Sequence, residues 1–254
     1  PFEDDRILTT DRLSLYRGTC NVCGSGSMLA VHPATPFKSM DDVIAASKRE
    51  PNKWSYGTSG VGGPHHLSGE YFKSVTGAKL LHIPYKGGGP AMTAVASGEV
   101  QLHFPAASVG QPMHKAGRVR AIAFTGAKRL TTMPELPTIA EAGVPGFEVL
   151  SWYGLLAPAG TPTEIITRLN QEVTRSLNEP EAVERLRAIG AEPMKSTPAE
   201  FNAFLKNEFA KWAKVIRTAG VRANCSDFGA DLVCADVKAT KHLARVCRHQ
   251  HGTH

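Results

Sequence analysis

The stretches that decide the fold are Tyr56-Gly-Thr-Ser-Gly-Val-Gly-Gly-Pro-His-His66 and Tyr85-Lys-Gly-Gly-Gly-Pro-Ala91. Each is a glycine-rich turn that follows a short apolar segment and contains a proline. Proline is favoured as the first residue of a helix, because its φ angle is preset and it needs no N–H donor there. Helix N-termini present unpaired N–H groups and roughly half a positive charge. Both turns are therefore candidate binding sites for a carboxylate or phosphate. The alternative is that they are ordinary strand-to-helix turns without a ligand.

Strand and helix signals alternate around these turns. We predict strands at residues 28–32, 54–56, 80–84, 100–104 and 119–124, and helices at residues 39–47, 64–75, 90–97 and 109–116. Repeated β-α units of this length predict an α/β fold with a mostly parallel sheet covered by helices. Ligands of such sheets lie beyond the carboxyl ends of the strands, where both glycine-rich turns fall.

The sequence that follows these alternating units is more helical. Thr161-Pro-Thr-Glu164 and Thr197-Pro-Ala-Glu200 both match a capping box with proline at the first helical position. We therefore interpret Glu164 and Glu200 as helix caps and not as catalytic acids. After the second box, large apolar residues recur at helical spacing and predict a buried face that needs a sheet to pack on; they are Phe201, Phe204, Leu205, Phe209, Trp212, Val215 and Ile216.

Several longer motifs occur in one characteristic order. They include His82-Ile-Pro-Tyr-Lys-Gly-Gly-Gly-Pro-Ala91, Gly98-Glu-Val-Gln-Leu-His-Phe104, Pro134-Glu-Leu-Pro-Thr-Ile-Ala-Glu-Ala-Gly-Val-Pro-Gly-Phe147 and Ser151-Trp-Tyr-Gly154. In these motifs the chain resembles the Bug family, the periplasmic substrate-binding proteins of tripartite tricarboxylate transporters, over about residues 28–221. The resemblance implies a type II periplasmic-binding-protein-like fold, with one nearly complete parallel-sheet domain and part of a second.

The resemblance also implies a division of the chain. Residues 28–145 correspond to the α/β ligand-binding domain, which is the family's second domain, and residues 146–223 to a mostly helical remainder of the first domain. Residues 1–27 are atypical, because residues 12–27 do not read like the apolar strand of the family, and residues 224–254 form an atypical tail that could be disordered. We expect an incomplete binding protein whose aromatic helix face is partly exposed and which binds carboxylates poorly.

In the family, a small carboxylate lies between two domains and faces a helix N-terminus from each. The resemblance maps the first loop onto Thr58, Ser59, Gly60, Gly62 and Gly63 with the amides of His65 and His66, and the second loop onto Tyr85, Gly87, Gly88 and Gly89. Hydroxyl groups can donate to a carboxylate, and glycines let the backbone approach it closely. Ser108 follows a strand after which the family commonly carries a polar ligand-contacting residue. Trp152 and Tyr153 either line the cleft or belong to the core.

Composition and motifs argue against several other classes of protein. The net charge of +6 is dispersed and forms no dense basic patch, so we expect no nucleic-acid binding. No apolar stretch approaches the ~20 residues of a transmembrane helix, so we expect no direct membrane insertion. No nucleophile motif, His-Glu-x-x-His motif, P-loop or dinucleotide fingerprint is present. We therefore expect neither an enzyme nor a cofactor.

Five cysteines lie near the two ends of the sequence. Cys20 and Cys23 could form a redox motif or half of a zinc site, with Cys247 among the further ligands, and Cys225 and Cys234 make up the five. The spacing matches no standard zinc finger, so we predict no metal site.

The resemblance implies an extracytoplasmic solute-binding protein that captures a small carboxylate for the membrane subunits of a tripartite tricarboxylate-type transporter. A ligand-sensing or interaction module of a two-component regulatory system, which would use the same fold without transport, is the alternative. The periplasmic location rests on the resemblance, because the sequence shows no secretory signal pattern. The sequence does not name the carboxylate.

Overall fold

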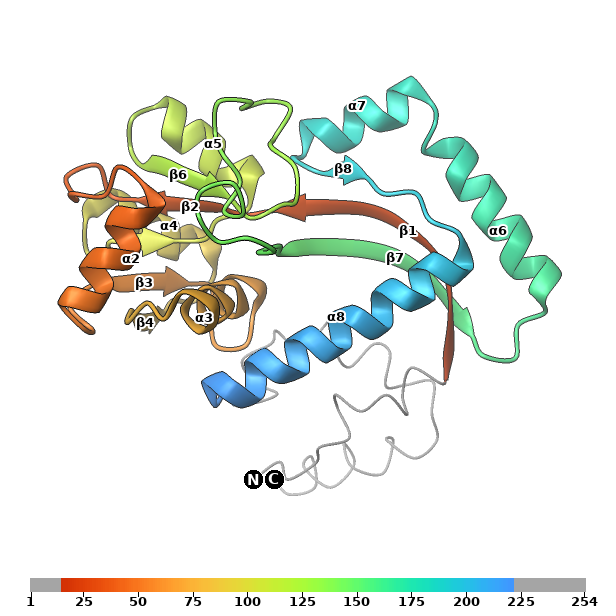
Figure 1. Cartoon of the computed structure of the whole chain (residues 1–254). Coiled ribbons are helices and arrows are strands. Elements are labelled where there is room, and N and C mark those ends of the chain that lie inside the picture. Colours follow the sequence, from red (N-terminus) through yellow and green to blue (C-terminus); the bar gives the residue numbers. More distant parts are fainter. Residues whose placement is uncertain (1–14, 222–254) are drawn as a thin grey trace, which may run out of the picture.

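Two sheets organise residues 15–221, the part of the chain that this computed structural model describes (Figure 1). One sheet has the strand order β7-β1-β8, built from β1 (Tyr16–Gly26), β7 (Leu150–Pro158) and β8 (Glu192–Pro193). In Figure 1 the antiparallel β1–β7 ribbon runs away from the second sheet and along helix α8. This ribbon joins the two parts of the molecule.

The second sheet has five strands in the order β4-β3-β5-β2-β6. Its strands are β2 (Met28–Val31), β3 (Ser55–Thr58), β4 (Leu81–Pro84), β5 (Leu102–His103) and β6 (Arg120–Phe124). Strand β3 is parallel to both β4 and β5, whereas β2 is antiparallel to both β5 and β6. The sheet is therefore mixed and not mostly parallel as expected. The cause is local, since β2 continues directly from β1 with only Ser27 between them and no crossover helix orients it.

Four helices accompany this sheet: α2 (Met40–Arg49), α3 (Pro64–Thr76), α4 (Gly88–Ser97) and α5 (Ala107–Lys115). Helix α3 begins at Pro64, as predicted. It ends at Gly77, which has a φ of 71° that glycine adopts without strain. Helix α4 begins at Gly88, two residues before Pro90, so the prediction that this proline opens the helix is wrong.

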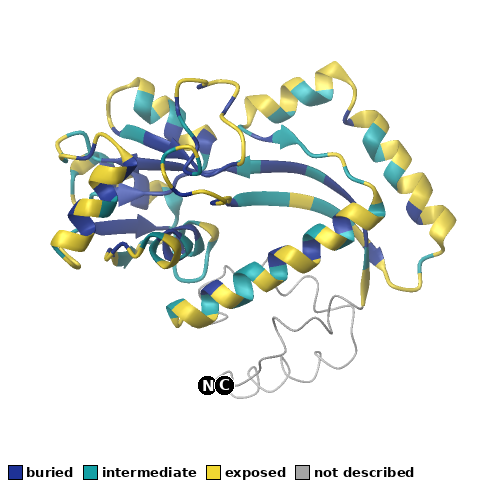
Figure 2. Ribbon diagram, in the orientation of Figure 1, coloured by how far each residue is buried: buried dark blue, intermediate teal, exposed yellow. Residues whose placement is uncertain are grey.

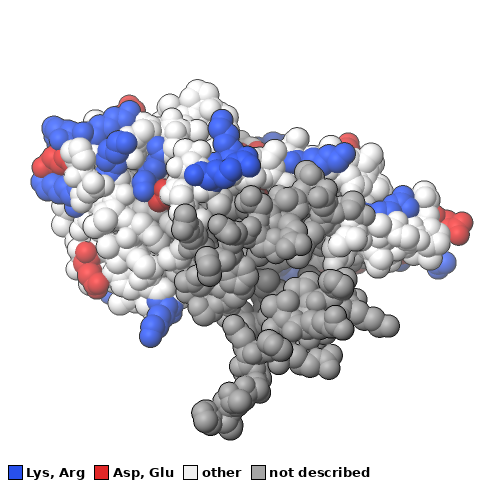
Figure 3. Space-filling view, turned by 90° about the horizontal axis from the view of Figure 1, so that it is seen from below, with Lys and Arg blue, Asp and Glu red and all other residues white. Residues whose placement is uncertain are grey.

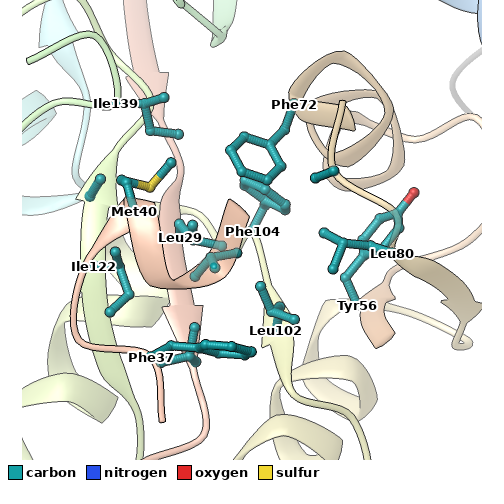
Figure 4. Packing of buried hydrophobic residues seen from close by; sticks show 14 of the residues in the cluster. Leu29, Phe37, Met40, Tyr56, Phe72, Leu80, Leu102, Phe104, Ile122 and Ile139 are labelled. Carbon is teal, nitrogen blue, oxygen red and sulfur yellow. The ribbon is translucent and has the colours of Figure 1, made fainter. Parts of the chain in front are cut away.

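The main hydrophobic core lies between the five-stranded sheet, α2 and α3 (Figure 4). Leu29 of β2, Tyr56 of β3 and Phe104, which follows β5, belong to one cluster with Met40 from α2 and Phe72 from α3, and all five are buried. Helix α3 approaches β3 closely at Gly69, where a Cβ atom would lie 2.2 Å from Cε2 of Tyr56. This tight packing fixes where the N-terminus of α3 points.

Strand β1 corrects the expectation for the N-terminal segment. Residues 16–26 form an 11-residue strand that pairs with β7 from Tyr16↔Pro158 to Gly26↔Leu150, with two bulges. We interpreted residues 12–27 as lacking the apolar strand of the family, and this interpretation is wrong for residues 16–26, which form a strand. The segment is rich in glycine and polar residues, and it is buried because other elements cover it.

Three helices follow β7: α6 (Thr163–Ser176), α7 (Pro180–Ala188) and α8 (Pro198–Ala219). Helix α8 opens with the predicted capping box of Thr197 and Glu200. Helix α6 has Pro162 at its N-cap position and no side-chain cap, so the predicted box that includes Glu164 does not form. Figure 2 shows α6 and α7 as mostly exposed, and α7 has no buried residue.

The aromatic face of α8 packs on the β1–β7 ribbon. Phe201 is fully buried, because Gly18 and Gly154 leave room for its ring: a Cβ atom at these glycines would lie 2.8 Å and 2.2 Å from it. Phe204 is only partly buried. The expectation that this face lacks a sheet is thus wrong for Phe201, since β1 and β7 supply one.

The surface of the described residues carries charges of both signs. In the view of Figure 3, Lys and Arg side chains form several separate groups with Asp and Glu between them. Within residues 15–221, no helix is long and apolar enough to cross a membrane. The expectations for Cys225, Cys234, Cys247 and the 224–254 tail fall outside the described residues, as do those for residues 1–14.

Candidate functional site

A cleft of about 500 Å³ lies between the β1–β7 ribbon, the starts of α3 and α5, and the α7–β8 turn. Its lining residues are Cys23, Ser25, Ser27, Pro64, His65, Ala106, Ser108, Ser151, Tyr153, Ile189 and Ala191. The volume falls within the roughly 300–1,000 Å³ typical of small-molecule sites. Three residues predicted from the sequence line this cleft: His65, Ser108 and Tyr153.

The hydroxyl groups of Thr58 and Ser59 in the first glycine-rich loop have hydrogen-bond partners in the loop and in neighbouring elements. Thr58 is buried, and its Oγ1 lies 2.6 Å from Nε2 of His82 and donates to the Gly60 carbonyl at 3.1 Å. Ser59 Oγ lies 3.0 Å from Nδ1 of His65, and the Gly62 N–H donates to Nδ1 of His66 at 2.9 Å. Thr58 therefore stabilises the turn. Sequence analysis placed Thr58 at the ligand, but it is not among the residues that line the cleft.

The backbone donors at the start of α3 remain available. Within the described part of the chain, the N–H groups of Gly63, His65 and His66 have no hydrogen-bond acceptor. Gly63 is the N-cap residue and provides no side-chain cap. These three donors belong to the positive end of a 13-residue helix, which favours an anion.

Four histidines lie behind this loop, and all are held neutral near pH 7. The His66 and His82 rings stack with centroids 3.8 Å apart, and the His65 and His103 rings meet edge to face at 5.0 Å. Burial lowers the pKa of His65 and His66, and it lowers the pKa of His82 to about 4 and of His103 to about 3. An anion in the cleft would therefore be held by neutral donors.

The second glycine-rich loop lies beside the cleft and is not among its lining residues. The Tyr85 hydroxyl donates to Oε1 of Glu99 at 2.8 Å, and the Tyr85 ring packs over Gly57, so this side chain points away from the cleft. Gly87 is the N-cap residue of α4. A Cβ atom at Gly88 would lie 3.5 Å from Cε1 of His65. The start of α4 therefore packs against His65, and neither it nor Gly89 forms a wall of the cleft.

The second helix start that lines the cleft is that of α5. The N–H group of Ser108 has no backbone acceptor among the loop and turn hydrogen bonds of the described residues. Ser27 pairs with Ala106 across an isolated bridge. Ser27 is buried, with 7% of the residue exposed, and it lines the cleft. Sequence analysis identified Ser108 here but missed Ser27.

Consecutive residues of β7 point to opposite faces, which decides between the two readings of Trp152 and Tyr153. Trp152 packs edge to face on Phe201 and Phe204, with centroids 5.8 Å and 5.5 Å apart. Tyr153 is 63% exposed and lines the cleft. Trp152 thus belongs to the packing with α8, and Tyr153 belongs to the cleft.

Sequence analysis also missed the serines and the cysteine that β1 and β7 bring to the cleft. Cys23 and Ser25 alternate along β1, and Ser151 lies on β7 opposite Ser25. An alternation of small residues at positions 23, 25 and 27 is the only sequence signal for this wall. Cys20 and Cys23 are free thiols, and burial raises the pKa of both.

The described residues share their fold with a solved periplasmic transporter structure that is 33% identical, with a TM-score of 0.67 over 82% of this chain and 69% of that chain. The model of the tripartite tricarboxylate transporter family receptor matches residues 11–221. The chain belongs to this family, which includes the Bug proteins that its motifs resemble. Because the match begins at residue 11, part of the segment that we interpreted as atypical is family sequence.

Individual relatives agree with this assignment. BugT of Bordetella pertussis is 33% identical over 195 residues, which are 77% of this chain and 60% of BugT. The structure of R. palustris Rpa4515 with adipate has a TM-score of 0.68 at 39% identity, covering 81% of this chain and 69% of that chain. MatC from Rhodopseudomonas palustris with bound malate has a TM-score of 0.65 at 25% identity, with coverages of 79% and 69%. The chain thus spans about three fifths of the length of curated relatives such as BugT.

Proposed function

We propose that this protein is an extracytoplasmic solute-binding protein that captures a small carboxylate in the described cleft and delivers it to the membrane subunits of a tripartite tricarboxylate-type transporter. The observation that carries the proposal is the convergence of two helix starts on one cleft. His65 marks the start of α3 and Ser108 the start of α5, and both helices bring N–H groups without acceptors. The structures of Rpa4515 with adipate and of MatC with malate support carboxylate as the ligand class.

Capture would depend on neutral donors. The N–H groups of two helix N-termini and the hydroxyls of Ser27 and Ser108 can donate to carboxylate oxygens. Charge-assisted bonds of this kind are roughly twice as strong as neutral ones. Because they point at the anion before it arrives, little reorganisation is needed on binding.

Closure of the cleft would bring its two walls together. The walls already touch where the α7–β8 turn meets α5, since a Cβ atom at Gly190 would lie 3.0 Å from the Ser108 nitrogen. The Gly190 carbonyl also accepts from the Ser25 hydroxyl at 2.9 Å. The turn that bears Gly190 is therefore the place where a bound solute would be enclosed.

Binding without turnover is part of the proposal. Ser59 and His65 lie at the 3.0 Å distance of a nucleophile and a base, yet no carboxylate of the described residues orients the other nitrogen of His65. Purified protein should therefore leave p-nitrophenyl esters unhydrolysed. Ester hydrolysis that disappears in a Ser59→Ala variant would contradict this part of the proposal.

A charge placed at the α5 start tests the proposal. Ser108→Asp puts a carboxylate where the ligand's carboxylate would bind, and an acidic residue in the first turn does not harm the helix itself. Calorimetric titration of the 254-residue chain with a panel of mono-, di- and tricarboxylates should give an affinity that this variant lowers at least about tenfold, through like-charge repulsion.

Thr163→Asp is the matched control, because Thr163 opens α6 and does not line the cleft. It should leave the affinity unchanged. Equal affinities in Ser108→Asp, Thr163→Asp and the parent protein would contradict the assignment of the cleft.

A further inference from the structure

Resting on the proposed function, we infer that His66 is a positioning residue for the carboxylate: its neutral imidazole holds Gly62 and thereby fixes the turn that presents the N–H groups at the start of α3. A hydrogen bond that reaches back along the helix carries this inference. The Gly62 N–H donates to Nδ1 of His66 at 2.9 Å, and His66 is the third residue of α3 whereas Gly62 lies before it. In a capping box, the side chain of the third helical residue accepts a similar bond from the backbone at the helix start.

The turn needs such a bond because its own sequence does not fix its path. Residues 60–63 are Gly-Val-Gly-Gly, and Gly60 and Gly62 have φ angles of 137° and 80°. Glycine loses more conformational freedom on folding than any other residue, so a turn of this composition is costly to order. Gly63, at the N-cap position, provides no side-chain cap. A bond from a side chain outside the turn is therefore required, and His66 supplies one.

The His66 ring is itself held in place. It is buried, and it stacks on the His82 ring with centroids 3.8 Å apart and an interplanar angle of 12°. Nε2 of His82 lies 2.6 Å from Oγ1 of Thr58, at the beginning of the turn. The two stacked rings therefore contact both ends of the turn, Thr58 through His82 and Gly62 through His66.

The bond to Gly62 requires the neutral form of His66. Because Nδ1 accepts from an N–H group, this nitrogen carries no hydrogen, and the single ring hydrogen of the neutral imidazole is on Nε2. A second proton on Nδ1 would place two N–H groups against each other. Protonation of His66 should therefore release Gly62 and loosen the turn beside the cleft.

The charged and titratable groups around His66 come from three elements. On α3, Oε1 of Glu70 lies 3.7 Å from Nε2 of His66 and 2.7 Å from Nζ of Lys73. The Tyr56 hydroxyl from β3 donates to the same oxygen at 2.6 Å, and His82 stacks from β4. Burial has the largest effect and lowers the pKa of His66 below 6.5; Lys73 acts in the same direction and Glu70 opposes it. His66 is thus neutral near pH 7 and becomes charged only in acid.

Two variants at position 66 test the inference. His66→Asn keeps an acceptor for Gly62, because its Oδ1 is as far along the side chain as Nδ1, but it does not titrate. His66→Leu fills similar space without an acceptor. In calorimetric titrations of the 254-residue chain with adipate, malate and citrate at about pH 7.5, His66→Asn should bind within about threefold of the parent protein. His66→Leu should bind at least about tenfold more weakly.

His114→Leu is the matched control. Nδ1 of His114 also accepts a backbone N–H, that of Ala121 at 3.3 Å, but His114 is not among the residues that line the cleft. This variant should leave the affinity unchanged.

A pH profile separates positioning from a general effect on folding. The affinity of the parent protein divided by that of His66→Asn cancels the titration of the ligand and of the groups that both proteins share. This ratio should fall as the pH is lowered from about 7.5 to about 5, by no more than about tenfold per pH unit. A charge on His66 that only attracted the anion would raise the ratio instead. Because both proteins keep the bond to Gly62 at neutral pH, the profile decides the question even if His66→Leu does not fold.

The outcomes separate this inference from the proposed function. An affinity of folded His66→Leu equal to that of the parent protein, or a ratio that stays constant or rises in acid, overturns the positioning role while carboxylate binding stands. No binding of any of the three carboxylates to the parent protein overturns the proposed function itself, and this inference with it.

Discussion

The packing of α8 on the β1–β7 ribbon gives the sharpest stability prediction. The Phe201 ring fills the space left by Gly154, where a Cβ atom would lie only 2.2 Å from Cζ of that ring. Phe201→Ala should lower the free energy of unfolding by about 3–5 kcal/mol, the usual cost of emptying a buried aromatic site. Gly154→Ala should cost about 1–3 kcal/mol, because the added methyl group overpacks the interface.

The double variant tests the reason for these costs. When the ring is absent, the methyl group at position 154 enters vacant space, so Gly154→Ala should cost little in the Phe201→Ala background. The two changes should therefore be non-additive by about 1–3 kcal/mol. Phe204→Ala is the control partner, because the three atoms nearest to a Cβ at position 154 all belong to Phe201, and it should add to Gly154→Ala within about 0.5 kcal/mol.

Urea unfolding followed by tryptophan fluorescence is the assay, since Trp152 lies 5.8 Å from the Phe201 ring and reports on this interface. A coupling between Phe201 and Gly154 that is no larger than the Phe204 control would refute the packing argument. It would mean that α8 does not lie on the ribbon in this register.

Three further predictions concern His103, Gly190 and Thr197. Burial lowers the pKa of His103 to about 3 from 6.5, so the unfolded chain takes up the proton first as the pH falls. The free energy of unfolding should drop by up to about 1.4 kcal/mol per pH unit between those values. His103→Asn, which retains a donor for Gly57, should flatten this slope in urea titrations, and an unchanged slope would contradict the assignment. Gly190→Ala should cost about 1–2 kcal/mol in thermal unfolding, because Gly190 has a φ of 73° that an L-residue adopts only with strain; a neutral effect would contradict this. Thr197→Ala should cost about 0.5–2 kcal/mol through loss of the α8 cap, whereas Thr161→Ala, whose box does not form, should cost much less in the same melts.

The sequence predicted the five-stranded sheet and its helices well because their signals are local. Strands β2 and β6 are short, mainly apolar runs, and a glycine marks the C-terminal end of both α3 and α4. The predicted bounds of β2–β6 and α2–α5 agree with the structure within two residues at every end. Sequence analysis did not predict that the sheet is mixed, because the antiparallel direction of β2 follows from its direct connection to β1.

The β1–β7 ribbon could not be predicted because its burial comes from distant residues. The β1 segment from Tyr16 to Gly26 is polar and glycine-rich, and it is covered only after Phe201 fills the space beside Gly18 and Gly154. The cleft residues that this ribbon contributes, such as Ser25, were missed for the same reason.

The candidate residues that local motifs predicted met different outcomes. His65 and Ser108 line the cleft because each lies at a helix start that the motifs mark. Tyr85 does not line the cleft. Its glycine-rich turn is also followed by a helix, and no local signal in the sequence indicates which of the two turns faces the β1–β7 ribbon. The distinction depends on the strand order of the sheet, which is a property of the whole fold.

A crystal structure of the 254-residue chain with the carboxylate that binds most tightly in the calorimetric panel tests the central claim most directly. We expect carboxylate oxygens within about 2.7–3.2 Å of the N–H groups of His65, His66 or Ser108. A carboxylate bound elsewhere on the protein, or a cleft without it at saturating concentration, would contradict the account.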